Sequence, residues 1–233
     1  RLSKRHGAVS VEAFKEQGIL PQTLLNYLAL LGWAPKDNRE KLEISELIAL
    51  FDITAIGKKD AVFDYEKLAW LNAQYIMQTP SKELIKYLKR DLNQKWLDNF
   101  TDDYSCAIMD LYKPRIKKIT EFIEKSKYFF TDDFEFDQPA LVKLKIEKNE
   151  TVKLLDFAIQ LIESSNFTNL NELESNFREF VKINNIKLNN LIAPLRLAIT
   201  GATATPGIFD ILFLLGKNKV LDRILQFKKR LED

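Results

Sequence analysis

Apolar residues recur along this chain at the spacing that places them on one face of an α-helix. In residues 21–31 they are Leu24, Tyr27, Leu28 and Leu31, the i, i+3, i+4, i+7 pattern of a helix packed on a core. Stripes of the same period follow within residues 45–51, 64–75, 81–92, 101–125, 154–162, 173–181, 188–195, 208–215 and 221–225. No segment shows a convincing alternation of apolar and polar residues, which would indicate a strand. The sequence therefore predicts an all-α fold, in which each stripe is first of all core.

Local signals predict where several helices begin and end. Ser10 and Asp64 carry short polar side chains that can accept a hydrogen bond from the first turn of a helix. Gly18 is a predicted stop, because glycine readily adopts the left-handed conformation that ends helices. Pro21 fits the first position of the next helix. Pro114 should kink or divide the helical stripe around it, since proline donates no backbone hydrogen bond.

Composition places the chain among folded globular proteins and removes several kinds of site. Hydrophobic residues make up 46% of the sequence and charged residues 29%. The longest apolar runs, such as residues 211–215, are far shorter than the ~20 residues that span a bilayer, so we expect no membrane segment. Cys106 and His6 are the only residues of their kinds, which leaves no disulfide framework and no Cys/His cluster for zinc. We therefore expect no metal site and a reducing, cytoplasmic location.

The first seven residues, Arg-Leu-Ser-Lys-Arg-His-Gly, form a candidate phosphate-binding loop. Lys4 offers a mobile positive charge, Ser3 a hydroxyl, and Gly7 lets the backbone approach an anion closely. The net charge of the chain is only +2, so any nucleic-acid contact must come from local basic patches such as this one. A solvated basic chain end is the structural alternative. With no initial methionine and no apolar signal core, we expect a piece of a longer protein.

This loop resembles the KMSKS signature of class I aminoacyl-tRNA synthetases, in the form typical of bacterial-type glutamyl-tRNA synthetases. The resemblance implies a catalytic role for Lys4, which, with Arg1 and Ser3 beside it, would contact the phosphates of ATP. These enzymes use ATP together with Mg2+. A cation at this position stabilises the negative charge that develops on the leaving pyrophosphate. Arg1 stands where the family has a lysine, so the charge is kept but the geometry is not.

The resemblance extends along most of the chain. Residues 18–33 and 61–75 are similar to the stem-contact fold of these synthetases, which touches the inner corner of the tRNA. Residues 128–137 resemble the connection between the two helical parts of the anticodon-binding region. The implied parts are a loop and stem-contact domain at 1–78, a first helical anticodon-binding subdomain at 79–135, and a second at 136–233.

The most specific C-terminal similarity covers residues 195–201, Leu-Arg-Leu-Ala-Ile-Thr-Gly, and residues 205–209, Thr-Pro-Gly-Ile-Phe. The guanidinium of Arg196 has donors suited to a base edge or a phosphate. A Pro-Gly turn at a helix start can present backbone groups and an apolar wall to an unstacked base. By resemblance, the anticodon-contacting positions are Arg196, Thr205, Pro206 and Ile208.

Arg115 is a further candidate RNA-binding residue. It lies in the basic run at residues 113–118, which could meet the anticodon loop from the first helical subdomain. A solvated basic face is the alternative interpretation of this run.

The family implies that the parent protein is a glutamate–tRNA ligase, which activates glutamate with ATP and transfers it to tRNA(Glu). Whether tRNA(Gln) is also charged is left open. The chain lacks a nucleotide-binding fold and a HIGH-type motif, so we expect it to bind tRNA as a monomer without aminoacylating it. Helical anticodon domains distinguish this family from glutaminyl and archaeal-type enzymes, which have β-barrels there. A helical protein-interaction module is the alternative from another class, with the basic loop incidental and every stripe simply core.

Overall fold

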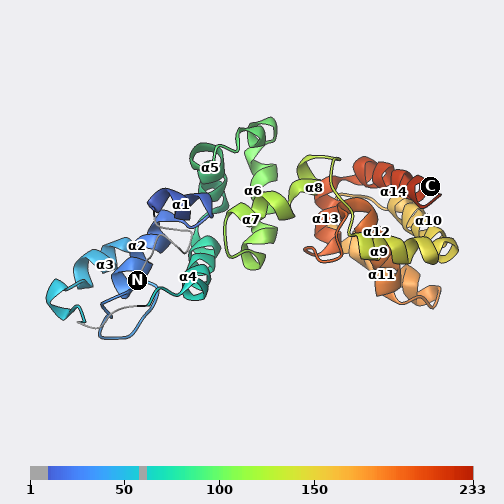
Figure 1. The fold of residues 1–233 in the computed structure, drawn as a ribbon. Helices are drawn as coiled ribbons and strands as arrows, with labels where there is room; N and C mark the ends of the chain where they lie inside the picture. Colours follow the sequence, from blue (N-terminus) through green and yellow to red (C-terminus); the bar gives the residue numbers. More distant parts are fainter. Residues whose placement is uncertain (1–9, 58–61, 233) are drawn as a thin grey trace. The chain divides into compact units, whose positions relative to one another are not determined.

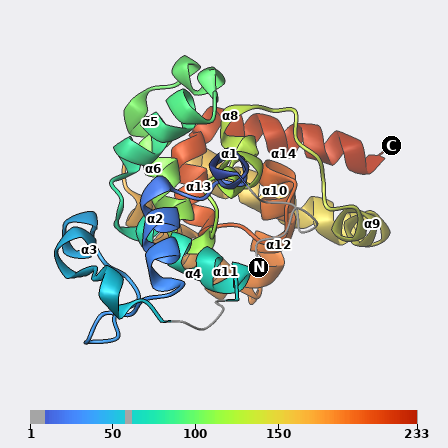
Figure 2. The same cartoon turned by 60° about the vertical axis from the view of Figure 1, so that its left-hand side comes forward.

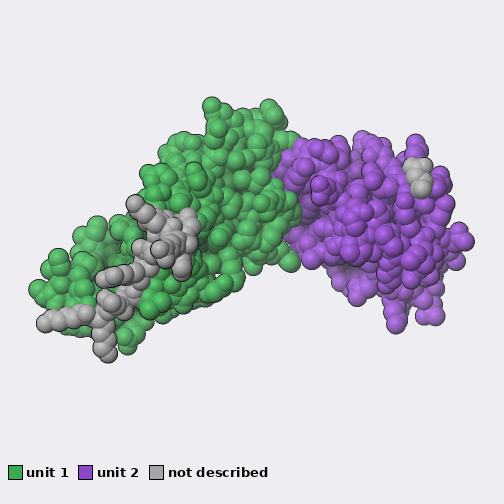
Figure 3. Space-filling view, viewed as in Figure 1, with its two compact units in different colours: residues 1–126 green, residues 127–233 purple. Residues whose placement is uncertain are grey.

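A computed structural model describes residues 10–57 and 62–232, and the chain divides into two compact units. Unit 1 comprises residues 1–126 and unit 2 comprises residues 127–233, coloured separately in Figure 3. Every regular element in the described ranges is helical, and none is a strand, which confirms the predicted all-α fold (Figure 1). No helix within these ranges is both long enough and apolar enough to cross a bilayer.

Unit 1 is built from two packed helix pairs joined by short turns. Helix α2 packs on α4, and α5 packs on α6. The bounds of its elements are α1 Val11–Glu16, α2 Pro21–Leu30, α3 Ile44–Leu50, η2 Ile53–Ala55, α4 Tyr65–Gln78, α5 Ser81–Asp91, η3 Lys95–Asn99, α6 Asp102–Tyr112, η4 Lys113–Arg115 and α7 Thr120–Lys125. The leucines and isoleucines that face inward on α4, α5 and α6 are almost fully buried, as their helical spacing predicts.

The predicted helix boundaries in unit 1 are confirmed by backbone geometry. The Ser10 side chain accepts a hydrogen bond from the backbone of α1, and the Asp64 side chain does the same for α4. Gly18 has a φ of +81°, which only glycine adopts without strain. Helix α6 ends at Tyr112, and Pro114 lies in the 3-10 turn that follows, so the helical stripe is divided there.

A buried asparagine connects three distant segments of unit 1. Asn72 on α4 is fully buried, and its side-chain oxygen accepts a hydrogen bond from the Leu20 amide at 2.9 Å. Its side-chain nitrogen donates to the carbonyls of Gly18, at 3.0 Å, and Lys117, at 2.7 Å. An amide group has one acceptor oxygen and two donor hydrogens, and here both ends are used. The basic run at residues 113–118 is thereby fixed to the start of α2.

Unit 2 is a helical bundle in which α10, α12 and α14 pack together, with α9 on one side and α11 and α13 on another (Figures 1 and 2). The bounds are α8 Lys127–Phe130, α9 Gln138–Ile146, α10 Lys148–Ser164, α11 Leu170–Ile183, α12 Leu188–Thr200, α13 Ile208–Leu215 and α14 Lys217–Glu232. Between α8 and α9 the chain runs without regular structure. We call residues 131–137 the connector.

Arg223 on α14 holds the connector to the bundle. Its side chain is only 4% exposed, and its guanidinium donates to the carbonyls of Tyr128, at 2.7 Å, and Thr131, at 3.0 Å. A third hydrogen bond of 2.6 Å reaches the carbonyl of Ile199 in the last turn of α12. The Asp132 carboxylate accepts two more, at 2.9 and 2.6 Å. One buried cation thus joins α14, α12 and the connector.

The Asp132 carboxylate is charged in this arrangement at neutral pH. Burial by itself raises the pKa of this carboxyl, but the hydrogen bonds and charge of Arg223 outweigh burial, so its pKa is lowered overall. A carboxyl whose pKa is lowered in the folded state stabilises the fold above its unfolded pKa. That stabilisation is lost as the pH falls through the folded value.

We predict that Arg223→Met lowers the free energy of unfolding by about 3 kcal/mol, because it leaves three backbone carbonyls without their donor. Urea unfolding followed by circular dichroism measures this loss. Lys229→Met is the matched control, since Lys229 is exposed on the same helix. Equal stability of the two variants would show that the connector is held by other contacts.

Candidate nucleic-acid interface

The four C-terminal residues predicted to contact an anticodon lie around one turn of unit 2. Helix α12 ends at Thr200, Gly201 takes a left-handed conformation, and α13 begins at Ile208. We call residues 202–207 the α12–α13 turn. Helix α13 is strongly apolar, and the bundle buries five of its eight residues, which fixes where the turn must end.

The guanidinium of Arg196 holds this turn from within the same unit. Its Nη1 donates a hydrogen bond of 2.8 Å to the carbonyl of Pro206 and also contacts the hydroxyl of Thr205. The structure therefore brings Arg196, Thr205 and Pro206 together, as the sequence analysis predicts. Arg196, which is predicted to read a base, therefore also stabilises the shape of the turn.

Burial differs among the predicted residues. Arg196 and Thr205 are partly exposed, whereas Pro206 is buried and Ile208 is only 5% exposed. Ile208 therefore belongs to the core beneath the turn in this conformation. The groups of the turn that face outward are the exposed residues Thr203, Ala204 and Gly207. Sequence analysis had not selected Thr203, because a threonine in a loop carries no signal of its own.

Gly201 at the start of the turn is in contact with the connector. It has a φ of +73°, and a Cβ atom built there would lie 2.0 Å from the carbonyl oxygen of Glu135. The Gly201 carbonyl accepts a hydrogen bond of 2.7 Å from the Asp137 amide. On its other side, the Thr200 hydroxyl donates to the Arg196 carbonyl at 2.8 Å and accepts from the Ala202 amide at 3.1 Å. The entry to the turn is therefore fixed from both directions.

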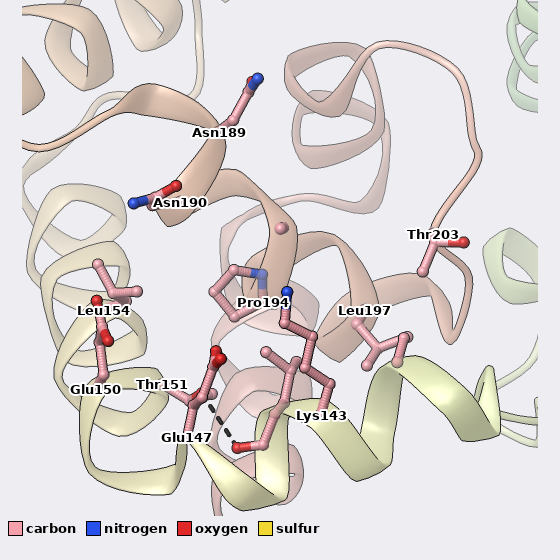
Figure 4. Close-up of a pocket in the computed structure, with 13 residues that line it drawn as sticks. Lys143, Glu147, Glu150, Thr151, Leu154, Asn189, Asn190, Pro194, Leu197 and Thr203 are labelled. Atoms are coloured by element: carbon pink, nitrogen blue, oxygen red, sulfur yellow. Dashed lines mark hydrogen bonds between the residues drawn. The ribbon is translucent and has the colours of Figure 1, made fainter.

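A pocket opens beside the turn, between α9, α10 and α12 (Figure 4). Its volume is 470 Å³, and Thr203 of the turn lines it at one end. The lining side chains of α12 include Asn190, Pro194 and Leu197, and α9 contributes Lys143. Sequence analysis had selected none of these residues, since the pocket depends on the packing of three helices.

Arg115 lies in unit 1, in the 3-10 turn after α6, and is exposed. Its neighbours in the basic run have partners. The Lys113 ammonium donates to the carbonyl of Thr79 at 2.8 Å, and that of Lys117 lies 3.8 Å from a carboxylate oxygen of Glu66. The charge of Lys113 is thus engaged within the unit, and Arg115 is the exposed cation of the 3-10 turn.

The remaining predicted site residues, Arg1, Ser3 and Lys4, lie outside the described residues. Over residues 10–57 and 62–232, no group of three or more His, Cys, Asp or Glu side chains is arranged to hold a metal ion.

Two family models match the chain. Residues 81–228 match the anticodon binding domain family, and residues 1–70 match the catalytic domain of class I tRNA synthetases (E and Q). The first match covers more than half of the sequence and includes the α12–α13 turn and Arg115. The chain therefore belongs to the anticodon binding domain family.

Individual relatives narrow the similarity to one kind of enzyme. Glutamate–tRNA ligase 1 of Syntrophus aciditrophicus is 38% identical over 224 residues, 96% of this chain and 47% of that protein. Glutamate–tRNA ligase 1 of Syntrophomonas wolfei is 35% identical over 225 residues, 96% of this chain and 45% of that protein. A crystal structure of a glutamate tRNA ligase from Elizabethkingia meningosepticum, in complex with its amino acid, has a TM-score of 0.83 at 26% identity. It covers 98% of this chain and 45% of that one.

The chain thus spans about half the length of the relatives it matches. The predicted resemblance to glutamyl-tRNA synthetases is confirmed.

We predict that Gly201→Ala destabilises unit 2 more than Gly216→Ala. Both glycines have positive φ, Gly201 in the left-handed helical region and Gly216 in an extended region that is almost exclusive to glycine, so each substitution adds on the order of 1–3 kcal/mol of backbone strain. At Gly216 an added Cβ meets nothing within 4 Å, whereas at Gly201 it meets the backbone of Glu135. The Gly201 variant should therefore lose about 1–3 kcal/mol more, the usual cost of overpacking. Urea unfolding of both variants measures the difference, and equal losses would mean that the connector moves away freely.

Proposed function

We propose that this chain is the tRNA-binding part of a glutamate–tRNA ligase and recognises the stem and anticodon of tRNA(Glu). The observation that carries the proposal is the match of residues 81–228 to anticodon binding domains, with the Arg196-held turn inside that region. The parent protein would activate glutamate with ATP and Mg2+ and transfer it to the tRNA. A monomeric state, a cytoplasmic location and activity on tRNA(Gln) stay open predictions.

The functional division of the chain is part of this proposal. Residues 1–78 would contain the ATP loop and the stem-contact domain, and residues 79–135 and 136–233 the two anticodon-binding subdomains. By contact, the two compact units divide between Ser126 and Lys127. The connector lies in unit 2 and is bonded there to Arg223, which makes it suited to anchor the second subdomain.

The geometry of the α12–α13 turn suits the reading of unstacked bases. RNA sequence is read mostly in single-stranded loops, where splayed bases meet backbone groups and flat or apolar surfaces. Arg196 bonds the Pro206 carbonyl and the Thr200 hydroxyl accepts from the Ala202 amide, so the turn is already ordered and little conformational entropy would be lost on binding. Arg196 and Thr205 remain partly exposed and could donate to a base edge.

The ATP loop at the start of the chain would act in the activation step. Lys4, assisted by Arg1 and Ser3, would place positive charge and a hydroxyl beside the transferring phosphates. Charge that is stronger in the transition state than in the ground state lowers the barrier.

We predict that Arg196→Ala weakens binding of tRNA(Glu) by about 1–3 kcal/mol and also narrows the preference for the cognate anticodon. The measurement is a gel shift with tRNA(Glu) and anticodon-mutated tRNA across a salt series. Arg178→Ala is the matched control, because this arginine is exposed on α11 of the same unit and pairs only locally with Glu174.

Three other results are informative. An equal loss of binding affinity for every tRNA, with the salt dependence of binding reduced by about one, would show that Arg196 contacts a phosphate and not a base. An effect on stability alone would limit Arg196 to shaping the turn. No salt-dependent RNA binding by the unmodified chain would instead favour a protein-interaction module.

We predict that Lys4→Ala in the full-length parent enzyme slows amino-acid activation, with a loss of about 2–4 kcal/mol in transition-state stabilisation. ATP–pyrophosphate exchange in the presence of tRNA measures this step. Lys15→Ala serves as the control, because Lys15 is a partly exposed cation on α1, close in sequence. An unchanged exchange rate would remove Lys4 from the catalytic role.

A further inference from the structure

The pocket between α9, α10 and α12 has the dimensions and position of a second RNA site. At 470 Å³ it falls within the range of about 300–1,000 Å³ typical of small-ligand pockets. Thr203 belongs both to its lining and to the α12–α13 turn. An RNA loop held at the turn would therefore have its neighbouring nucleotide at the mouth of this pocket.

The lining of α12 offers a surface for the face of a base. Pro194 lies in the middle of the helix and is buried, with Leu197 one turn further on. A proline ring and a leucine side chain make this part of the lining apolar, although both residues are largely buried. Ala193, which also lines the pocket, is exposed, so the space above it is open.

Pro194 has a second consequence for the pocket. Because proline has no amide hydrogen, the carbonyl of Asn190 does not receive the hydrogen bond it would have in an uninterrupted helix. Asn190 lines the same pocket. The Asn190 carbonyl thus lacks the donor that an uninterrupted helix would supply, at a residue that lines the pocket.

The rim adds further acceptors and one cation. The carboxylates of Glu147 and Glu150 and the amide side chain of Asn189 surround the opening, together with the Lys143 ammonium. None of the three charged side chains, Glu147, Glu150 and Lys143, takes part in an ion pair found within the described residues. Carboxylate and carbonyl oxygens accept hydrogen bonds from exocyclic amino groups of bases, and a lysine suits a phosphate.

We propose that this pocket binds one unstacked base of the tRNA loop, next to the nucleotides held at the α12–α13 turn. The excess of acceptors selects a base with an exocyclic amino group, namely cytosine, adenine or guanine, over uracil. Lys143 contacts the phosphate of that nucleotide. The proposal rests on the proposed RNA-binding function of unit 2.

The test uses an anticodon stem–loop RNA of tRNA(Glu), with each amino-bearing loop nucleotide outside the anticodon replaced singly by uridine. The unmodified chain should lose affinity about tenfold at one such position. Ala193→Phe fills the pocket from an exposed position. The variant should bind all of these RNAs with one affinity, about equal to that of the unmodified chain for the RNA with the sensitive uridine. Val142→Phe is the control of equal bulk, since Val142 is exposed on α9 and does not line the pocket.

A second variant makes the result independent of how Ala193→Phe packs. Lys143→Ala should reduce the salt slope by about one and keep the penalty for uridine at the selected position. If Ala193→Phe and Val142→Phe bind alike, or if no position is sensitive to uridine, the pocket is not an RNA site. In that case anticodon preference and its dependence on Arg196 would persist. If the unmodified chain binds no stem–loop at all, the proposed function fails together with the pocket.

Discussion

The arrangement of several segments of unit 2 depends on the hydrogen-bond partners of one buried guanidinium, that of Arg223. Arg223 is almost entirely removed from water, so each of its donors needs a partner within the protein. Those partners are carbonyls and a carboxylate from segments about 24 and 91–95 residues away in sequence. Because Ile199 is among them, the same group that holds the connector also fixes the last turn of α12, from which the α12–α13 turn begins. The position of the α12–α13 turn therefore follows from the hydrogen bonds of Arg223.

The α12–α13 turn is held at three points before any RNA arrives. Arg196 bonds the Pro206 carbonyl at the far end of the turn, and the Thr200 hydroxyl accepts from the Ala202 amide at its near end. Gly201 lies directly against the connector. A binding surface that is already ordered loses little entropy when it binds, which favours discrimination between similar ligands. The pocket that Thr203 shares with α9, α10 and α12 extends this ordered surface, and its acceptor-rich rim differs in chemistry from the arginine-held turn. The two sites would therefore read different features of one RNA loop.

Unit 1 shows the same use of a few buried polar groups to fix distant segments. Asn72 joins the start of α2 to the loop after η4, and so sets the position of the basic run that contains Arg115. Within that run, the Lys113 ammonium is bonded to the Thr79 carbonyl, whereas Arg115 and Lys117 are exposed at the surface. A count of charges along the sequence could not identify Lys113 as the engaged residue, since its partner Thr79 lies 34 residues away at the end of α4.

The helices and their ends followed from the sequence, because they depend on interactions within about four residues. Ser10, Gly18, Asp64 and Pro114 act through their own backbone and the adjacent turn, and their predicted effects are confirmed. The clustering of Arg196 with Thr205 and Pro206 was also within reach, since the three are close in the chain and match a known family pattern. Arg223, by contrast, is one of several cations in the last helix, and nothing local marks it as buried. Its role, the contact of Gly201 with Glu135 and the pocket beside Pro194 were decided only by tertiary packing, which brings together groups that are remote in sequence.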